Sequence, residues 1–279
     1  MTAKAAEAGA TEPLPQVSTA RAAWRVVATV LHILHGVGVV SLTWHRLDLV
    51  GRQARIAWWS RGVIERLGMD LSVQGQAQAE PALVVANHVS WLDIMVVHAV
   101  MPQARFVAKS DVRSWPVLGW LMASVGTLFI ERGRPRDAVR VRQMMTQALQ
   151  AGETVAVFPE GTTGTGPQVL PFHANLLQAA VASAVPVQPV ALRLSAPGQP
   201  YSATVSWIGD ETLAASIWAI AKSQGLCAHA QVLQRVDPAG LDRRVLAGRL
   251  HQILAAAVRH DATAALRHDA TPACGSTAG

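Results

Sequence analysis

Short apolar runs alternate with helical periods through most of the chain. Runs of β-branched and other apolar residues predict strands, and apolar residues three and four apart predict helices. The predicted strands are residues 82–86, 104–108, 126–130, 154–158, 185–192, 203–207 and 230–236. The predicted helices are residues 91–100, 115–124, 137–150, 174–183, 211–223 and 241–258. This alternation predicts an α/β domain over residues 70–258, with a largely parallel sheet flanked by helices.

The pattern is different before residue 70. Residues 24–44 are an apolar stretch bracketed by Trp24 and Trp44, about as long as the roughly 20 residues that a bilayer-spanning helix needs. Residues 47–67 place arginines and tryptophans at helical spacings, which is typical of an amphipathic helix in a membrane interface. We therefore expect membrane-embedded and interfacial helices over residues 21–69. A buried helix or a secretory signal would also explain the first stretch, and a surface helix packed on the core would explain the second.

Both ends of the chain are poor in large apolar residues. Residues 1–20 are small and polar and contain proline, and residues 259–279 are rich in alanine and threonine and carry the segment RHDAT twice. Such segments bury too little apolar surface to offset the entropy of an ordered chain. Both are predicted to be disordered tails.

Composition narrows the class of partner. Hydrophobic residues make up 51% of the chain and charged residues 15%, the net charge is +6, the mean hydropathy is +0.25 and the pI is about 10.3. An apolar and basic chain suits an anionic membrane surface, and without an aromatic and basic binding motif we expect no nucleic acid partner. The two cysteines, Cys227 and Cys274, match no metal-site spacing and imply no disulfide framework, as expected for a reducing compartment.

Two residues with catalytic potential follow the predicted strand at 82–86. In the stretch NHVSWLD, His88 comes just after the strand and Asp93 five residues later. On one continuous helix these two side chains would point about 140° apart. They can meet if His88 lies in the loop and Asp93 in the first turn of the next helix. The carboxylate would then orient the imidazole, and its other nitrogen would take a proton as a general base.

Three further blocks follow in order near the ends of predicted strands. They are GTLFIERG at 126–133, VFPEGTT at 157–163 and VPVQPVAL at 185–192. Together with NHVSWLD they resemble the four ordered motifs of the 1-acyl-sn-glycerol-3-phosphate acyltransferase family, the glycerolipid and lysophospholipid acyltransferases. The resemblance covers roughly residues 82–192.

This resemblance implies transfer of an acyl chain from acyl-CoA or an acyl carrier protein to the free hydroxyl of a lysophospholipid, with no metal or other cofactor. It implies His88 as the general base and Asp93 as its orienting partner. It also implies that the acceptor is bound by Lys109, Arg132, Glu160, Gly161 and Thr162. A guanidinium and the backbone of a Gly-Thr-rich loop suit a phosphate. A carboxylate would repel it, so Glu160 would bind an acceptor hydroxyl or hold Arg132.

One position departs from the family pattern. Many members carry a lysine where this chain has His173, which weakens the case for a phosphate monoester acceptor. We expect 1-acylglycerol-3-phosphate as the acceptor, giving phosphatidic acid in phospholipid biosynthesis, with lyso-ornithine lipid or another lysolipid as the alternative. A hydrolase that activates water with His88 and Asp93, and a non-catalytic lipid-binding membrane protein, are the other classes considered. The expected location is the inner membrane, with the active site facing the cytoplasm.

Overall fold

A central sheet organises the computed structural model, which describes residues 14–115, 117–130 and 135–267. The strands in these ranges are β1 (Met69–Gln74), β2 (Leu83–Ala86), β3 (Ala104–Lys109), β4 (Leu128–Ile130), β5 (Thr154–Val157), β6 (Val187–Ser195) and β7 (Leu226–Val232). They form one seven-stranded sheet in the order β1-β7-β6-β2-β5-β3-β4. Among them the β6–β7 pair is antiparallel and the other neighbours are parallel. The predicted largely parallel sheet is confirmed.

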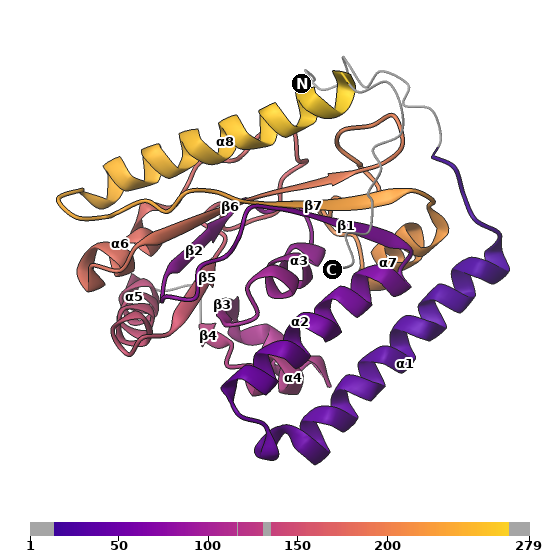
Figure 1. Cartoon of the computed structure of the whole chain (residues 1–279), viewed down its shortest axis with the longest axis horizontal. Coiled ribbons are helices and arrows are strands. Elements are labelled where there is room, and N and C mark those ends of the chain that lie inside the picture. Colours follow the sequence, from indigo (N-terminus) through magenta and orange to yellow (C-terminus); the bar gives the residue numbers. More distant parts are fainter. Residues whose placement is uncertain (1–13, 116, 131–134, 268–279) are drawn as a thin grey trace.

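Helices cover both faces of this sheet (Figure 1). One face packs against α2 (Leu49–Arg66), α3 (Leu92–Val100) and α7 (Leu213–Lys222). The other face packs against α5 (Pro135–Gln150), α6 (Ala174–Ser183) and α8 (Arg243–Arg267). Outside these layers lie α1 (Thr19–Thr43), the short η1 (Trp44–Arg46) and η2 (Ser110–Ser114), and α4 (Leu118–Ser124). The helices follow the predicted ranges closely, apart from the longer α8.

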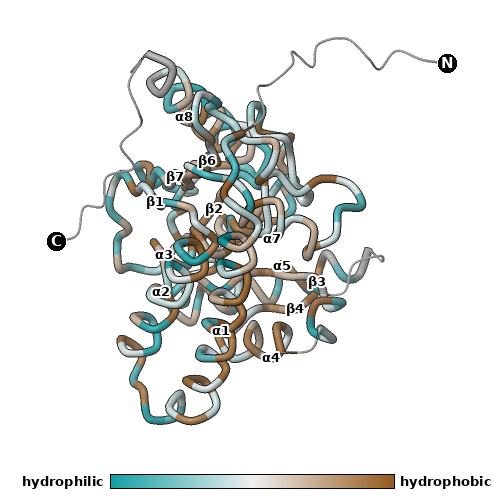
Figure 2. Tube along the Cα trace, turned by 90° about the vertical axis from the view of Figure 1, so that its right-hand side faces the viewer, coloured by the Kyte–Doolittle hydropathy of each residue, from teal (hydrophilic) through white to brown (hydrophobic). Residues whose placement is uncertain are grey.

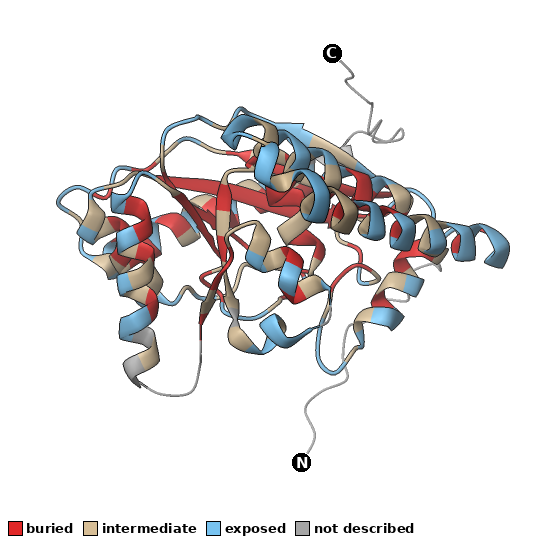
Figure 3. Ribbon diagram, turned by 90° about the horizontal axis from the view of Figure 1, so that it is seen from below, coloured by how far each residue is buried: buried red, intermediate tan, exposed pale blue. Residues whose placement is uncertain are grey.

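Strand β2 shows why the sheet is buried on both sides. All of its residues are buried, and the sheet is largely red in Figure 3. Val84 and Ala86 belong to the apolar cluster on the α3 face, whereas Leu83 and Val85 belong to the cluster on the α6 face. Successive side chains of a strand point to opposite faces, so a central strand covered by helices requires an unbroken apolar run.

The first helix is exposed and apolar. Residues Thr19–Arg46 are, within the described ranges, the one helical stretch long and apolar enough to cross a membrane by length and composition, and 17% of its apolar window is buried. Trp24, Leu31, Leu34 and Leu42 are more than half exposed. Figure 2 shows α1 as a largely hydrophobic tube at the edge of the molecule. This composition agrees with the predicted membrane helix.

The chain just before α1 is attached to the α/β domain. Val17 is buried and donates its backbone N–H to the Lys222 carbonyl at 2.9 Å. Inside α1, the Arg25 guanidinium donates to two carbonyls at the end of α7, at 2.7 and 3.0 Å. Residues 14–18 fall in the predicted disordered tail 1–20, but backbone hydrogen bonds at Pro15 and Val17 hold them on the α/β domain.

Helices α1 and α2 form a hairpin. His32 Nε2 lies 3.0 Å from the Trp59 carbonyl oxygen, and the Trp59 indole N–H donates to the His32 carbonyl at 3.3 Å. Val63 and Ile64, near the end of α2, are buried in the same apolar cluster as the sheet. The segment 21–69 is therefore continuous with the α/β domain rather than a separate layer.

The prediction of a strand at 203–207 is wrong. This segment forms turns in which Val205 is buried, and the Ser202 N–H donates to the Leu194 carbonyl. Strand β6 pairs with β7 over residues 190–195 but with β2 only over 187–190. Beyond Val190 the β2 side of β6 is bonded by the Asn87 side chain and by the Ser202 N–H, so a single contact replaces a strand pairing. The apolar run fills space beside the sheet instead of extending it.

Two other strands differ from the prediction. The apolar runs did not predict β1, whose sequence MDLSVQ alternates apolar and polar residues as a half-exposed edge strand does. The strand predicted at 230–236 lies earlier, at Leu226–Val232. There its residues pair with β1 on one side and β6 on the other.

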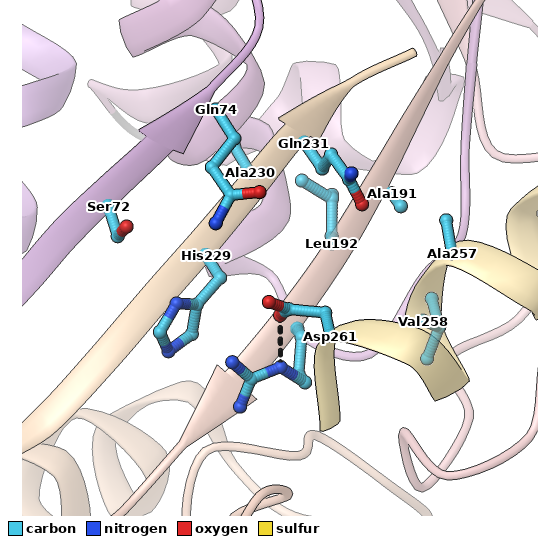
Figure 4. A pocket seen from close by; sticks show the side chains of 11 residues that line it. Ser72, Gln74, Ala191, Leu192, His229, Ala230, Gln231, Ala257, Val258 and Asp261 are labelled. Carbon is cyan, nitrogen blue, oxygen red and sulfur yellow. Dashed lines mark hydrogen bonds and ion pairs between the residues drawn. The ribbon is translucent and has the colours of Figure 1, made fainter. Parts of the chain in front are cut away.

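The last helix is longer than predicted. Helix α8 continues to Arg267, so the tail predicted for residues 259–279 does not begin at 259. In this added part of α8, Asp261 forms an ion pair with the buried Arg193 on β6. Asp261 lies above the sheet near His229 (Figure 4). Burial, with a smaller contribution from the Arg193 charge, lowers the pKa of His229 to about 4, so this imidazole stays neutral at pH 7.

We expect Asp261→Ala to lower the free energy of unfolding by about 3 kcal/mol, because the buried guanidinium would lose its carboxylate. Urea unfolding in detergent, followed by circular dichroism, would measure the loss. The double variant Arg193→Met/Asp261→Leu should recover most of it, since it leaves no unpaired charge. An Asp261→Ala variant as stable as the wild type would show that the pair does not anchor α8.

Candidate active site

His88 and Asp93 meet as the sequence predicts. His88 lies in the loop after β2, and Asp93 lies in the first turn of α3. The distance from His88 Nδ1 to Asp93 Oδ2 is 2.9 Å. The His88 side chain is 18% exposed and that of Asp93 is fully buried. One imidazole nitrogen is therefore held by a carboxylate, while the ring remains accessible from the carboxyl edge of the sheet.

The same carboxylate oxygen also holds the backbone of the loop. Asp93 Oδ2 accepts from the N–H groups of Val89 at 2.6 Å and Ser90 at 2.8 Å. These bonds bend the chain around the carboxylate at the start of α3, where the helix dipole favours negative charge. The loop and the imidazole are thus positioned by one buried group.

Both carboxylate oxygens of Glu160 bond the backbone. Its two carboxylate oxygens accept from the N–H groups of His88 and Leu170, each at 2.8 Å, and the residue is 5% exposed. Burial raises the pKa of Glu160 to about 7, although both N–H groups and His88 oppose the shift. Glu160 therefore ties the loop after β2 to the loop after β5.

An aromatic residue that the sequence did not single out supports the imidazole. The rings of His88 and Phe158 are stacked, with centroids 4.0 Å apart and planes 8° apart. Phe158 in turn stacks on Phe106 of β3, with centroids 5.5 Å apart. Phe158 stands in the FPEGTT block, directly after β5. Its place in this block was the sequence feature that could have marked it as a site residue. The stack limits rotation of the His88 ring.

The remaining contacts close the loop from the other side. The buried Asn87 side chain exchanges two hydrogen bonds with the backbone of Leu192 on β6, at 2.7 and 2.8 Å. Gly164 donates its N–H to the His88 carbonyl, and Trp207 donates to the Val89 carbonyl. The turn segment 203–207 thus covers the loop at His88 instead of forming a strand.

The other predicted site residues are placed only in part. Gly161 and Thr162 are exposed beside Glu160, and Gly161 has a φ of 71°, which favours glycine. A Cβ on Gly161 would come within 3.0 Å of the His173 ring, so His173 lies against this loop. Lys109 ends β3, but its side chain and the whole of Arg132 lie outside the described residues. In the part of the chain that the structure covers, no cluster of His, Cys, Asp or Glu side chains could hold a metal.

Comparison with known proteins agrees with this geometry. The family model described as Acyltransferase matches residues 70–193. The lyso-ornithine lipid O-acyltransferase of Pseudomonas aeruginosa is 37% identical over 201 residues, which cover 72% of this chain and 77% of that protein. The chain belongs to the lysophospholipid acyltransferase family. The predicted resemblance is confirmed.

Other relatives of the acyltransferase carry a different acceptor in their names. The 1-acyl-sn-glycerol-3-phosphate acyltransferase of Neisseria meningitidis is 44% identical over 135 residues, and the match spans about half of it (52%). The crystal structure of the 1-acyl-sn-glycerophosphate (LPA) acyltransferase of Thermotoga maritima superposes with a TM-score of 0.70 at 22% identity, covering 90% of this chain and 97% of that one. This match shows that the fold is shared.

The buried Glu160 predicts a dependence of stability on pH. Its folded pKa of about 7 lies above the ordinary value of 4.5, so the folded state holds the proton more tightly. Stability from this group is complete below about pH 4.5 and is lost as the pH rises through 7, by up to about 3 kcal/mol. Urea unfolding from pH 4.5 to 7.5 would show this decline in the wild type. An equal decline in Glu160→Gln would contradict the assignment.

Proposed function

We propose that His88 is the general base in transfer of an acyl chain from a thioester to the hydroxyl of a lysolipid. The main support for this role is the 2.9 Å contact between His88 Nδ1 and the buried Asp93 carboxylate. The imidazole ring itself remains accessible. Acyl transfer to lysolipids is the activity named for the relatives. A hydrolase or a passive lipid-binding protein would not account for those relationships.

In the proposed step, Nε2 of His88 removes the proton of the acceptor hydroxyl. The oxygen attacks the thioester carbonyl, and a tetrahedral intermediate forms. Collapse of this intermediate expels the thiolate, which takes the proton from His88, so that the products are an ester and a thiol. Asp93 holds the Nδ1–H and stabilises the imidazolium between the two transfers. The step needs no metal or other cofactor.

The second part of the proposal concerns which lysolipid is the acceptor. His173, in the place of a family lysine, lies against Gly161 in the loop that would face the acceptor's anionic group. An imidazole binds a phosphate monoester less strongly than a lysine ammonium does. Together with the 37% identical relative named for lyso-ornithine lipid, this favours lyso-ornithine lipid as the acceptor. The second candidate is 1-acylglycerol-3-phosphate, supported by the Neisseria relative.

The helical hairpin supports a position on one side of the membrane. Residue Val17, before α1, is bonded to Lys222, and α2, after it, packs on α3. Both ends of α1 are therefore attached to the same domain, whereas a helix that crosses the bilayer would separate them. We place α1 and α2 in one leaflet of the inner membrane, facing the cytoplasm. The donor is acyl-CoA or an acyl carrier protein, and the +6 net charge suits either anionic partner.

We expect His88→Ala to lower kcat by about a thousandfold or more, because proton removal in the transition state is lost. Asp93→Asn should also lower kcat strongly, since the amide cannot accept from the ring and both backbone N–H groups in the same way. The assay would follow diacyl product from labelled acyl-CoA or acyl carrier protein. Full activity in His88→Ala would reject the general-base role.

His173→Lys tests the acceptor. The added ammonium should raise kcat/KM for 1-acylglycerol-3-phosphate relative to lyso-ornithine lipid by about tenfold, as expected for a contact of 1.4 kcal/mol. Both acceptors would be compared in wild type and variant under identical micelle conditions. His173→Gln is the matched control, because it adds no charge. An unchanged ratio would remove His173 from acceptor selection.

A further inference from the structure

A short segment beside the candidate active site exposes large apolar side chains. Trp115, Val117 and Trp120 are 40%, 46% and 44% exposed. They lie between the end of η2 and the middle of α4, outside both apolar clusters of the core. Two tryptophans and a valine within six residues are unusual on a surface that meets water alone, whereas tryptophan is enriched where a membrane meets water.

The local packing holds these side chains outward. On α4 it is Gly119 and Leu121 that are buried. A Cβ on Gly119 would come within 2.3 Å of the Arg113 carbonyl oxygen, so α4 rests closely on η2 through this residue. Trp120, between these two buried positions, points away from that contact. The exposure of the segment therefore follows from its tight packing on the inner side.

The exposed segment continues the surface of the helical hairpin. Helix α4 contacts α1, and the two lie next to each other in Figure 2. The outward residues of α1 include Leu31 and Leu34, which are 55% and 54% exposed. In contrast, α8 lies on the opposite face of the sheet (Figure 1).

A cavity of about 130 Å³ adjoins the same segment. Arg113 and Arg140 line it with the Ser110 hydroxyl group, over walls formed by Phe129, Ile130, Val141 and Met144. Asp137 also lines it and limits how much negative charge it would accept. Two guanidinium groups at the edge of an apolar surface suit the single negative charge of a phosphodiester headgroup.

The strand register places this cavity relative to the catalytic imidazole. Val85 pairs with Val157, and Phe106 pairs with Ala156, so the chain at His88 and the chain at Ser110 leave the sheet at the same height. They are two strands apart, which corresponds to about 10 Å. The cavity therefore lies beside the site of acyl transfer, at the same edge of the sheet.

We infer that η2, Trp115, Val117 and α4 form a second membrane contact. In this contact Trp115, Val117 and Trp120 enter the lipid surface, and the cavity beside Arg113 and Arg140 holds a phosphodiester headgroup. This inference rests on the proposed position of α1 and α2 in the membrane. Together, the hairpin and this segment hold the opening at His88 against the bilayer, from which a lysolipid enters.

The position of the segment can be measured with probes on single cysteines. The full chain carrying Cys274→Ser would be labelled with bimane at Trp120→Cys, with Leu34→Cys on α1 and Val245→Cys on α8 as references; Cys227 is buried and is left in place. In vesicles containing phosphatidylglycerol and doxyl lipid, the probes at 34 and 120 should be quenched by the lipid and shielded from iodide. The probe at 245 should show the opposite behaviour.

The references separate the two proposals. If the probe at 34 is quenched by lipid and the probe at 120 is not, the second contact is wrong and the hairpin stands. If neither is quenched, the membrane position of the hairpin fails as well. Val117→Cys repeats the test should Trp120→Cys not fold.

The headgroup cavity has its own test. Arg113→Gln/Arg140→Gln should reduce the stimulation of acyl transfer by phosphatidylglycerol in phosphatidylcholine vesicles by about fivefold for each arginine, and leave activity in detergent micelles unchanged. Arg244→Gln/Arg249→Gln on α8 removes the same charge far from the segment and is the matched control. Equal losses in the two variants, or a wild type that phosphatidylglycerol does not stimulate, would overturn the headgroup site.

Discussion

Asp93 Oδ2 accepts three hydrogen bonds, from the His88 ring at 2.9 Å and from two backbone N–H groups at 2.6 and 2.8 Å. Asp93 is fully buried at the start of α3, whose buried Leu92, Val96 and Val97 belong to the core. A buried carboxyl group must find hydrogen-bond donors, and here the donors are the His88 imidazole and the backbone of its own loop. The packing of α3 on the sheet therefore determines where the imidazole lies.

The order of the strands brings the other supports to the same place. Strand β2 lies between β5 and β6, so the loop at His88 has a neighbour on each side. From β5 come Phe158, which stacks on the ring, and Glu160, which holds the backbone. On β6 the backbone of Leu192 bonds the Asn87 amide. An imidazole held from both sides by a rigid sheet, in the proposed role of general base, loses little entropy when the acceptor arrives.

The hairpin and the sheet are one packed unit. Helix α2 ends inside the core, and the segment before α1 is bonded beside α7. The apolar surface that α1 leaves exposed is thus fixed in orientation relative to the catalytic loop. An enzyme whose acceptor is a membrane lipid needs its active site at a fixed position relative to the membrane. The acceptor hydroxyl lies near the membrane surface from which the lysolipid enters.

The sequence by itself determined the class of fold, the apolar helix and the pairing of His88 with Asp93, because these depend on local periodicity and on residues five apart. Tertiary contacts decided several other features. Pairing within the sheet set the positions of β1 and β7 and left 203–207 as turns. The length of α8 goes together with the buried charge of Arg193. The roles of Glu160 and Phe158 were decided only in the tertiary structure. Glu160 and His88 are 72 residues apart, and their hydrogen bond exists because β2 and β5 are neighbours in the sheet. No local pattern of residues carries that information.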